Sequence, residues 1–390
     1  MRVLIAFDKF KGSLSAPQAC DLAVRALRRR HREWKIDVCP ICDGGEGFAD
    51  ILSGAARGRC PTVKVGGPRG GLVDASLALV PFDHIPPAAR RQISPPGEGQ
   101  ATADDRAIVA VMEMATASGL GLLPPDQRDP WQTTTYGTGQ LIRAAAELGA
   151  QAIVLGVGGS ATNDLGLGAL AALGLEFRGP DGGRIRPPVP AQWERINAID
   201  GEVFPSIPPI SIACDVTNPL LGPRGAAAVF GPQKGLQAGD RPRLESAMER
   251  MAGLLCTHCG RPSSLTETPG AGAAGGLPFG LLVAARARII PGFDFVSAWL
   301  DLPARIARAD IVITGEGRFD ESSLSGKGPG AVARVAASLG KRVHVFAGQK
   351  DAELPCAGWQ VHVITPDDWP LDRALREAPQ RLVQVVEAAF

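Results

Sequence analysis

The amino-acid sequence predicts an α/β protein whose two ends build one parallel-sheet domain, with a second α/β domain inserted between them. Apolar strand patterns alternate with helical patterns near both termini, and this alternation is typical of parallel sheets. The middle of the chain is less regular, and the Pro-rich stretch 81–99 has the composition of a boundary. The length of 390 residues also exceeds what one hydrophobic core usually supports. We therefore expect two domains with a binding site in the cleft between them.

Composition and charge exclude several classes of protein. The net charge is +1, so the chain lacks the basic excess with which proteins neutralise nucleic-acid phosphates. No run of about 18 apolar residues is present, so we expect no membrane span. The first apolar run is too short for a secretion signal and has the pattern of a strand. We expect a cytoplasmic protein.

Eight cysteines include two C-x-x-C pairs, Cys39 with Cys42 and Cys256 with Cys259. Zinc ribbons separate such pairs by about 15–20 residues. The two pairs here are much farther apart in the sequence. Buried thiols in a reducing compartment explain them better than a zinc site does.

Residue patterns define the elements expected in the first half of the chain. Ser15 and Gln18 form a capping box, so a helix begins there and runs to about Arg30. We interpret 107–118 as mainly helical, and a second helix up to Leu148 follows the hydroxyl-rich segment 133–139. The other expected elements are strands at 2–7, 35–40 and 63–79 and a helix at 48–56.

The second half of the chain returns to alternating strands and helices. We expect the closing helix, 372–390, to be interrupted near Pro379, because proline has no N–H and clashes with the preceding turn. The other expected elements are a hairpin at 176–185, strands at 210–213, 310–314, 342–347 and 361–364, and helices at 241–256 and 331–339.

One stretch combines several signals of a binding loop. Residues 153–168 read I-V-L-G-V-G-G-S-A-T-N-D-L-G-L-G, which predicts a strand, a tight loop and a helix reaching Leu173. Glycine lets the backbone approach other backbone or a ligand closely. The N–H groups that begin a helix attract an anion, so the loop suits a phosphate, and Asp164 suits a metal ion or a proton. A turn capped by Ser, Thr, Asn or Asp explains the same pattern.

Polar residues follow several of the predicted strands, and open parallel sheets bind ligands at the carboxyl ends of their strands. Lysines and glycine-rich loops hold phosphates, carboxylates hold Mg²⁺, and one carboxylate can accept a proton, so this set suits phosphoryl transfer. The groups are Asp8 with Lys11; Asp43 with Glu46; Ser160, Asn163 and Asp164; Asp215, Asn218 and Lys234; the loop 270–276; and Glu316, Arg318, Asp320 and Lys327.

The loop 270–276 contains G-x-G-x-x-G, the pattern of dinucleotide-binding proteins. That pattern indicates a dinucleotide site only when a strand precedes it and a helix follows. The preceding segment is polar and flanked by proline, so we do not assign a Rossmann site here.

Seven motifs in this order resemble the type I glycerate kinase family. They are D-K-F-K-G-S-L (8–14), D-G-G-E-G (43–47), G-G-S-A-T-N-D (158–164), C-D-V-T-N-P-L (214–220), F-G-P-Q-K-G (230–235), G-A-G-A-A-G-G (270–276) and T-G-E-G-R-F-D (314–320). The resemblance implies ATP- and Mg²⁺-dependent phosphorylation of glycerate, specifically of D-glycerate to 2-phosphoglycerate, with ADP as the other product. It also implies a flavodoxin-like domain of residues 1–81 and 288–390, with the α/β domain 82–287 inserted.

The resemblance also implies site positions, whose individual roles are our interpretation. In an extended segment alternate residues point the same way, so Glu316, Arg318 and Asp320 are expected to face the cleft together. The catalytic candidates are Asp164, Asp43, Lys11 and Asp215. The candidates for binding substrate or nucleotide are Asp8, Glu46, Ser160, Asn163, Asn218, Lys234, Gly270, Gly272, Arg318 and Lys327. The candidates for holding the metal are Glu316 and Asp320. The position phosphorylated, the nucleotide preference and a homo-oligomeric state stay open.

Two other functions are compatible with parts of the sequence. An NAD-dependent hydroxyacid oxidoreductase would explain the glycine patterns, but it requires a strand before Gly270. A non-catalytic protein that binds sugar acids would need a cleft, but not this many carboxylates.

Overall fold

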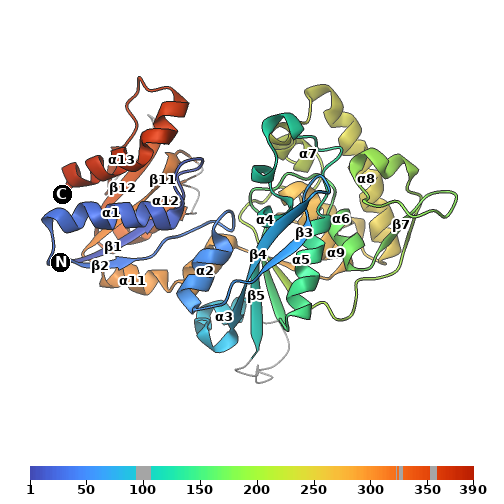
Figure 1. The fold of residues 1–390 in the computed structure, drawn as a ribbon, viewed down its shortest axis with the longest axis horizontal. Helices are drawn as coiled ribbons and strands as arrows, with labels where there is room; N and C mark the ends of the chain where they lie inside the picture. The colour runs from blue at the N-terminus through green and yellow to red at the C-terminus, as the bar shows by residue number, and fades with distance from the viewer. Residues whose placement is uncertain (94–106, 322, 325–327, 352–357) are drawn as a thin grey trace. The chain divides into compact units, whose positions relative to one another are not determined.

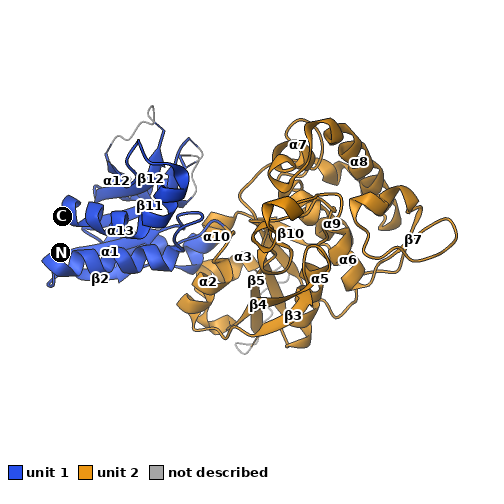
Figure 2. Ribbon diagram, turned by 45° about the horizontal axis from the view of Figure 1, so that its top comes forward, with its two compact units in different colours: residues 1–43, 296–390 blue, residues 44–295 orange. Residues whose placement is uncertain are grey.

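The computed structural model describes residues 1–93, 107–321, 323–324, 328–351 and 358–390. The chain forms two compact units, which we call unit 1 (residues 1–43 and 296–390) and unit 2 (residues 44–295), as Figure 2 shows. Both units contain parallel strands and helices, so the predicted α/β class is confirmed.

Unit 1 is built on a five-stranded sheet in which every neighbouring pair of strands is parallel. The strand order is β13-β12-β11-β1-β2, which read from the other edge is the 2-1-3-4-5 order of flavodoxin-like folds. The order reverses between β1 and β11, and such a switch point is where these sheets bind ligands. The strands are β1 (Arg2–Phe7), β2 (Lys35–Val38), β11 (Ile311–Phe319), β12 (Arg342–Lys350) and β13 (Gln360–Val363).

In the described part of unit 1, this sheet is accompanied by the helices α1 (Ala16–Arg30), α11 (Leu302–Arg308), α12 (Gly328–Ser338) and α13 (Leu371–Ala389). Helices α1 and α13 pack side by side, and α11 packs beside α12 (Figure 1). Small residues of α1, such as Ala19 and Ala23, and larger ones of α13, such as Leu382, form one core with Ile5 and Ile313 of the sheet. The predicted capping box of Ser15 and Gln18 is confirmed.

Helix α13 runs through Pro379 without the interruption that we expected. A proline at this position leaves the carbonyl of Leu375, four residues earlier, without its helical N–H donor. The hydroxyl of Ser13 takes that place and donates a hydrogen bond of 2.7 Å to this carbonyl. The helix therefore continues because a side chain from another segment satisfies the exposed acceptor.

Unit 2 is built on a six-stranded mixed sheet in the order β10-β9-β6-β5-β4-β3. Strands β5, β6, β9 and β10 are mutually parallel, while β3 and β4 join antiparallel at one edge. The strands are β3 (Thr62–Gly66), β4 (Leu72–Pro81), β5 (Ile108–Glu113), β6 (Ala152–Gly156), β9 (Ile210–Ala213) and β10 (Arg288–Ile290). Strands β7 (Glu176–Arg178) and β8 (Ala198–Asp200) form a separate antiparallel pair.

The helices that the structure describes in unit 2 are α2 (Phe48–Ala56), α3 (Pro87–Ile93), α4 (Ala115–Ser118), α5 (Tyr136–Glu147), α6 (Leu167–Leu173), α7 (Ala226–Phe230), α8 (Arg241–His258) and α9 (Leu277–Ala284), with α10 (Gly292–Trp299) crossing into unit 1. Helices α2, α4 and α5 pack against the six-stranded sheet, and α6, α7, α8 and α9 pack against other helices (Figure 1). None of the helices in the described part of the chain combines the length and apolar character needed to cross a membrane.

The division between the units differs from the expected boundaries. Unit 2 begins at Gly44 instead of 82, because β3 and β4 pair with each other and β4 pairs with β5. It ends at Phe295 instead of 287, because β10 pairs with β9.

Two local predictions are corrected. Residues 108–113 form β5 and not a helix, because they pair with β4 on one side and β6 on the other, and only 115–118 of the expected helix are helical. The expected hairpin 176–185 is reduced to one bridge between Arg178 and Arg184, since β7 pairs along its length with β8.

Candidate active site

The switch point of unit 1 brings the segments after β1, β2 and β11 together. Parallel pairing aligns Phe7 with Gly315, and the N–H of Asp8 continues the ladder with a 3.0 Å hydrogen bond to the Gly315 carbonyl. Glu316 follows at once in β11, so two of the predicted site residues lie at the same edge of the sheet. Asp43 lies in the loop that follows β2.

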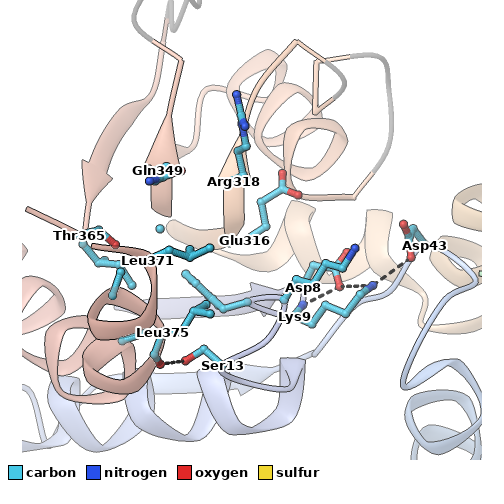
Figure 3. A pocket seen from close by; sticks show the side chains of 17 residues that line it. Asp8, Lys9, Ser13, Asp43, Glu316, Arg318, Gln349, Thr365, Leu371 and Leu375 are labelled. Carbon is cyan, nitrogen blue, oxygen red and sulfur yellow. Dashed lines mark hydrogen bonds and ion pairs between the residues drawn. The ribbon is translucent and has the colours of Figure 1, made fainter. Parts of the chain in front are cut away.

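Lys9 connects the acidic residues of this edge. Its ammonium nitrogen lies 3.3 Å from Oδ1 of Asp43 and 3.7 Å from Oδ1 of Asp8, and both contacts are drawn in Figure 3. The Asp8 side chain is buried, whereas that of Asp43 is half exposed. The first two strands of the fold thus contribute a carboxylate–lysine–carboxylate group. We call Asp8, Lys9, Asp43, Glu316 and Asp320 the switch-point cluster.

Burial and mutual repulsion disfavour negative charge in this cluster. Burial, assisted by the nearby Asp43 carboxylate and opposed by Lys9, raises the pKa of Asp8 to about 6. Burial, assisted by Asp8, Asp320 and Asp43, raises the pKa of Glu316 to about 8. A cation bound among these carboxylates would relieve this repulsion.

The switch-point cluster fits a magnesium ion. Oε1 of Glu316 is buried and has no hydrogen-bond partner among the residues that the structure describes, which leaves a carboxylate oxygen available for a cation. Within the described residues no three acidic, histidine or cysteine side chains gather at metal-binding distance. Magnesium nevertheless commonly takes one or two carboxylates and completes its shell with phosphates and water. Glu316 therefore suits the metal role predicted for it.

A cavity of about 350 Å³ opens beside this cluster. Lys11, which follows β1, lines it together with Glu316 and Arg318. Of the three residues expected to face one site, Glu316 and Arg318 line this cavity, where Figure 3 shows both, and Asp320 is not among its lining residues. Asp320 instead pairs with Arg318 at 3.5 Å, and Arg318 also contacts Asp351 at 3.1 Å. Lys327 lies outside the described residues.

Unit 2 contains the glycine-rich stretch that follows β6. A Cβ on Gly158 would lie 2.5 Å from the Cα of Gly45, and one on Gly156 would lie 2.5 Å from the Gly44 carbonyl oxygen. The N–H of Gly158 also bonds the Gly44 carbonyl at 3.3 Å. These glycines allow the D-G-G-E-G loop to pack directly on the stretch after β6, so close backbone packing explains them.

Asp164, the predicted catalytic carboxylate, is completely buried. Its carboxylate accepts hydrogen bonds from the backbone N–H groups of Thr135, Gly166 and Gly168 and from the hydroxyls of Thr134 and Thr135. Burial raises the pKa of Asp164, and the bonds from Thr135 and the two glycines oppose that effect. A carboxylate enclosed in this way fixes the start of α6 to the start of α5. This enclosure favours a structural role for Asp164, and its predicted role as proton acceptor stays a prediction.

Lys234 is also buried, at 1% exposure, and not open to a phosphate as predicted. Its ammonium group donates to the Thr162 carbonyl at 2.7 Å and to Oδ1 of Asn163 at 3.3 Å. Burial lowers the pKa of Lys234 to about 7, although the Asp164 carboxylate opposes that change. Nδ2 of Asn163 and Oγ1 of Thr162 are buried without a partner in the described chain. Lys234 thus orients Asn163, whose amide keeps a donor for a ligand.

The remaining predicted residues of unit 2 lie in loops that pack on one another. Asp215 accepts the N–H of Phe293 at 2.9 Å, at the start of α10, and Asn218 donates to the Arg224 carbonyl at 2.7 Å. Gly270 and Gly272 are buried, and a Cβ on Gly272 would lie 2.0 Å from the Pro219 carbonyl oxygen. Ser160 is buried and Glu46 is exposed. Ligand contacts at these positions stay predictions.

Two residues of interest were absent from the predicted site. Lys9 belongs to the same D-K-F-K-G motif as Lys11, so the motif could have indicated it. Glu113, at the end of β5, accepts the backbone N–H groups of Gly47 and Ala49 at 3.2 and 2.9 Å. It holds the start of α2, directly after the D-G-G-E-G loop, and burial raises its pKa to about 7. Because the sequence predicts a helix at 107–118, it does not place Glu113 at the carboxyl end of a strand.

A sequence profile of the glycerate kinase family matches residues 3–390, which is nearly the whole chain. The chain belongs to the glycerate kinase family. A protein named glycerate kinase from Bacillus subtilis (strain 168) is 39% identical over 351 residues, 89% of this chain and 85% of the relative. A protein named glycerate 2-kinase from Escherichia coli (strain K12) is 36% identical over 356 residues, which are 89% of this chain and 85% of that relative.

The fold is also that of a solved structure. The crystal structure of a candidate glycerate kinase 2 from Salmonella typhimurium LT2 has a TM-score of 0.77 and 35% identity, and the match covers 100% of this chain and 97% of that one. As a member of the glycerate kinase family the chain is an enzyme of the phosphotransferase class. The segment before Gly270 forms a short 3₁₀ helix, Ser263–Glu267, so the strand that an NAD-binding site requires is missing there.

Proposed function

We propose that this member of the glycerate kinase family transfers the terminal phosphoryl group of ATP to D-glycerate, with ADP and 2-phosphoglycerate as products. The observation that carries the proposal is the switch-point cluster, where carboxylates with raised pKa values lie beside lysines at the edge of a cavity. Phosphoryl transfer uses both kinds of group, because lysines hold phosphates and carboxylates hold Mg²⁺. The names of the relatives support glycerate as the acceptor.

Glu316 and Asp8 are the residues that would hold Mg²⁺. The unpartnered Oε1 of Glu316 and the raised pKa values of both carboxyls support this assignment. When bound there, the ion would supply positive charge to the phosphate oxygens, where negative charge accumulates during transfer.

Lysines of the loop after β1 bind the phosphates. Lys11 is exposed at the cavity and presents a compact charge on a flexible side chain, which suits a phosphate. Lys9 pairs with Asp8 and Asp43 and lines the same cavity, where its ammonium group can also contact an anion. Arg318 is a third cation on the cavity wall.

Asp43 is the residue that would accept the proton of the glycerate hydroxyl. Its side chain is half exposed, unlike the enclosed Asp164, and Lys9 holds it at the edge of the cavity. Positioning contributes as much as proton transfer when the transition state is loose. The amide of Asn163, in unit 2, stays a predicted ligand contact of that unit. A cytoplasmic location and a homo-oligomeric state stay predictions.

A coupled ADP-release assay tests the proposal. We expect ADP release that requires D-glycerate and Mg²⁺ together. L-glycerate and D-lactate are the matched control acceptors, and neither should replace D-glycerate. In this assay Lys11→Ala should lower turnover strongly while Lys35→Ala, an exposed lysine at the start of β2, should not. ADP release at the same rate without any acceptor would contradict a glycerate kinase, because it would indicate hydrolysis of ATP alone.

A further inference from the structure

The cavity at the switch point has two chemically different sides. One side carries the charged residues already described: Asp8, Lys9, Lys11, Glu316 and Arg318. The opposite side is apolar, and its residues come from the position directly after β13 and from the first turns of α13 (Figure 3). They are Ile364, Leu371, Ala374, Leu375 and Ala378. The phosphate and metal roles of the charged side do not account for this apolar side.

The apolar side is one face of a helix. Leu371, Ala374, Leu375 and Ala378 recur at the spacing that places residues on the same face. The two alanines are buried and keep the helix close to the sheet, while Leu375 is half-buried. Leu371 is 67% exposed. An apolar side chain this exposed at the edge of a cavity is available to cover a ligand.

The two sides are held together by direct contacts. The Ser13 hydroxyl donates to the Leu375 carbonyl at 2.7 Å, which ties the loop after β1 to α13. Gly12, with φ of +80°, lies against the same leucine, and a Cβ there would be 3.6 Å from its methyl carbons. The lysines of this loop are therefore held at a fixed distance from the apolar face.

Polar groups are also present at the apolar end. Thr365 follows β13 and Gln349 lies near the end of β12, and both line the cavity with their side chains labelled in Figure 3. Neither side chain makes a hydrogen bond to another residue in the described part of the chain. A hydroxyl and a carboxamide can donate to and accept from the edge of a heterocycle.

We propose that this apolar face binds the purine base of the nucleotide, with the phosphates extending to Lys9, Lys11 and Arg318. A ligand that fills both sides must carry a flat apolar group and several negative charges, which describes a purine nucleoside di- or triphosphate. Glycerate is small and entirely polar, so it cannot use the apolar side. This inference rests on the proposed function and assigns the nucleotide to unit 1. The cavity volume of about 350 Å³ is in the range of ligand pockets.

The inference is tested by comparing ligands with and without a base. Isothermal titration calorimetry on the full chain would measure ADP and inorganic tripolyphosphate, each with Mg²⁺, for wild type, Leu371→Gln and Leu375→Ala. We expect ADP affinity to fall about 10-fold in each variant, because an apolar contact to the base is removed. Tripolyphosphate affinity should stay within twofold, since tripolyphosphate has no base. The matched control is Leu339→Gln, a leucine of unit 1 with 50% exposure that does not line the cavity.

Unchanged ADP affinity in both variants would overturn the inference, and so would an equal loss for ADP and tripolyphosphate. If wild type phosphorylates glycerate while the variants keep the wild-type KM for ATP, the nucleotide site fails and the kinase assignment stands. If wild type neither binds ADP nor phosphorylates glycerate, the proposed function fails and the inference fails with it.

Discussion

The hydroxyl of Ser13 donates a 2.7 Å hydrogen bond to the carbonyl oxygen of Leu375, the acceptor that Pro379 leaves without a helical donor. One contact thus satisfies a backbone group inside α13 and fixes the loop that carries Lys9 and Lys11. The continuity of the last helix and the geometry of the switch-point cavity depend on the same bond.

We expect Ser13→Ala to lower the free energy of unfolding by about 1–2 kcal/mol, because it leaves a backbone carbonyl unsatisfied. In a Pro379→Ala background the same change should cost much less, since the alanine N–H restores the helical bond to Leu375. Urea unfolding of the four proteins in this double-mutant cycle measures the coupling. Equal costs in the two backgrounds would show that the Ser13 hydroxyl does not replace the missing donor.

We expect Glu316→Gln to raise the Mg²⁺ concentration needed for half-maximal activity. Because the pKa of Glu316 is raised to about 8, protons compete with the metal below that pH. Wild type should therefore require less Mg²⁺ at pH 8.5 than at pH 6.5, and the variant should lose this contribution. Mg²⁺ titrations of activity at the two pH values measure both effects. Identical titrations of wild type and variant would remove Glu316 from the metal site.

Asp164→Asn should act on stability and not on chemistry. The carboxylate accepts hydrogen bonds from surrounding N–H and O–H groups, whereas the NH₂ group of asparagine is itself a donor and would face those donors. We therefore expect the free energy of unfolding to fall by about 2–3 kcal/mol. The kcat of the folded protein should stay within about threefold of wild type. Thermal melts measure the loss of stability, and kinetics at one temperature measure kcat. A 100-fold loss of kcat at an unchanged melting temperature would instead restore Asp164 as a catalytic group.

Glu113 should make stability fall as the pH rises. Its pKa is about 7 in the folded protein against an ordinary 4.5, so the folded state binds more protons than the unfolded state between these values. The stabilisation from this group is therefore complete below pH 4.5 and is lost as the pH passes 7. Between pH 5 and pH 8 the melting temperature of wild type should fall more than that of Glu113→Gln. Glu46→Gln, an exposed residue of the adjoining loop, is the control, and parallel profiles for Glu113→Gln and wild type would contradict the prediction.

Local signals predicted many of the elements. Strand β1 and helix α2 have the expected bounds, and α1 begins at the expected capping box, because short-range patterns determine all three. The helix wrongly expected at 107–118 shows the limit of such patterns. Its apolar run fits a strand or a buried helix equally well until the neighbouring strands β4 and β6 are known.

The site could be predicted only in part for the same reason. Residue types at the ends of strands indicated Asp8, Asp43 and Glu316, because topology alone places such positions together. The role of Asp164 depends on Thr135, which is 29 residues away, and that of Ser13 on Leu375, which is 362 residues away. No spacing in the sequence reports such pairs, so burial and hydrogen bonding had to come from the structure.

The most direct test of the central claim is proton-coupled ³¹P NMR of wild-type enzyme with ATP, Mg²⁺ and D-glycerate. We expect the ATP signals to give way to those of ADP and of one new phosphate monoester. That signal should be a doublet, because phosphorus on C2 of glycerate couples to a single methine proton. A triplet would place the phosphate on the CH₂ group of C3 and contradict the 2-phosphoglycerate product. Inorganic phosphate without any monoester would contradict glycerate phosphorylation itself.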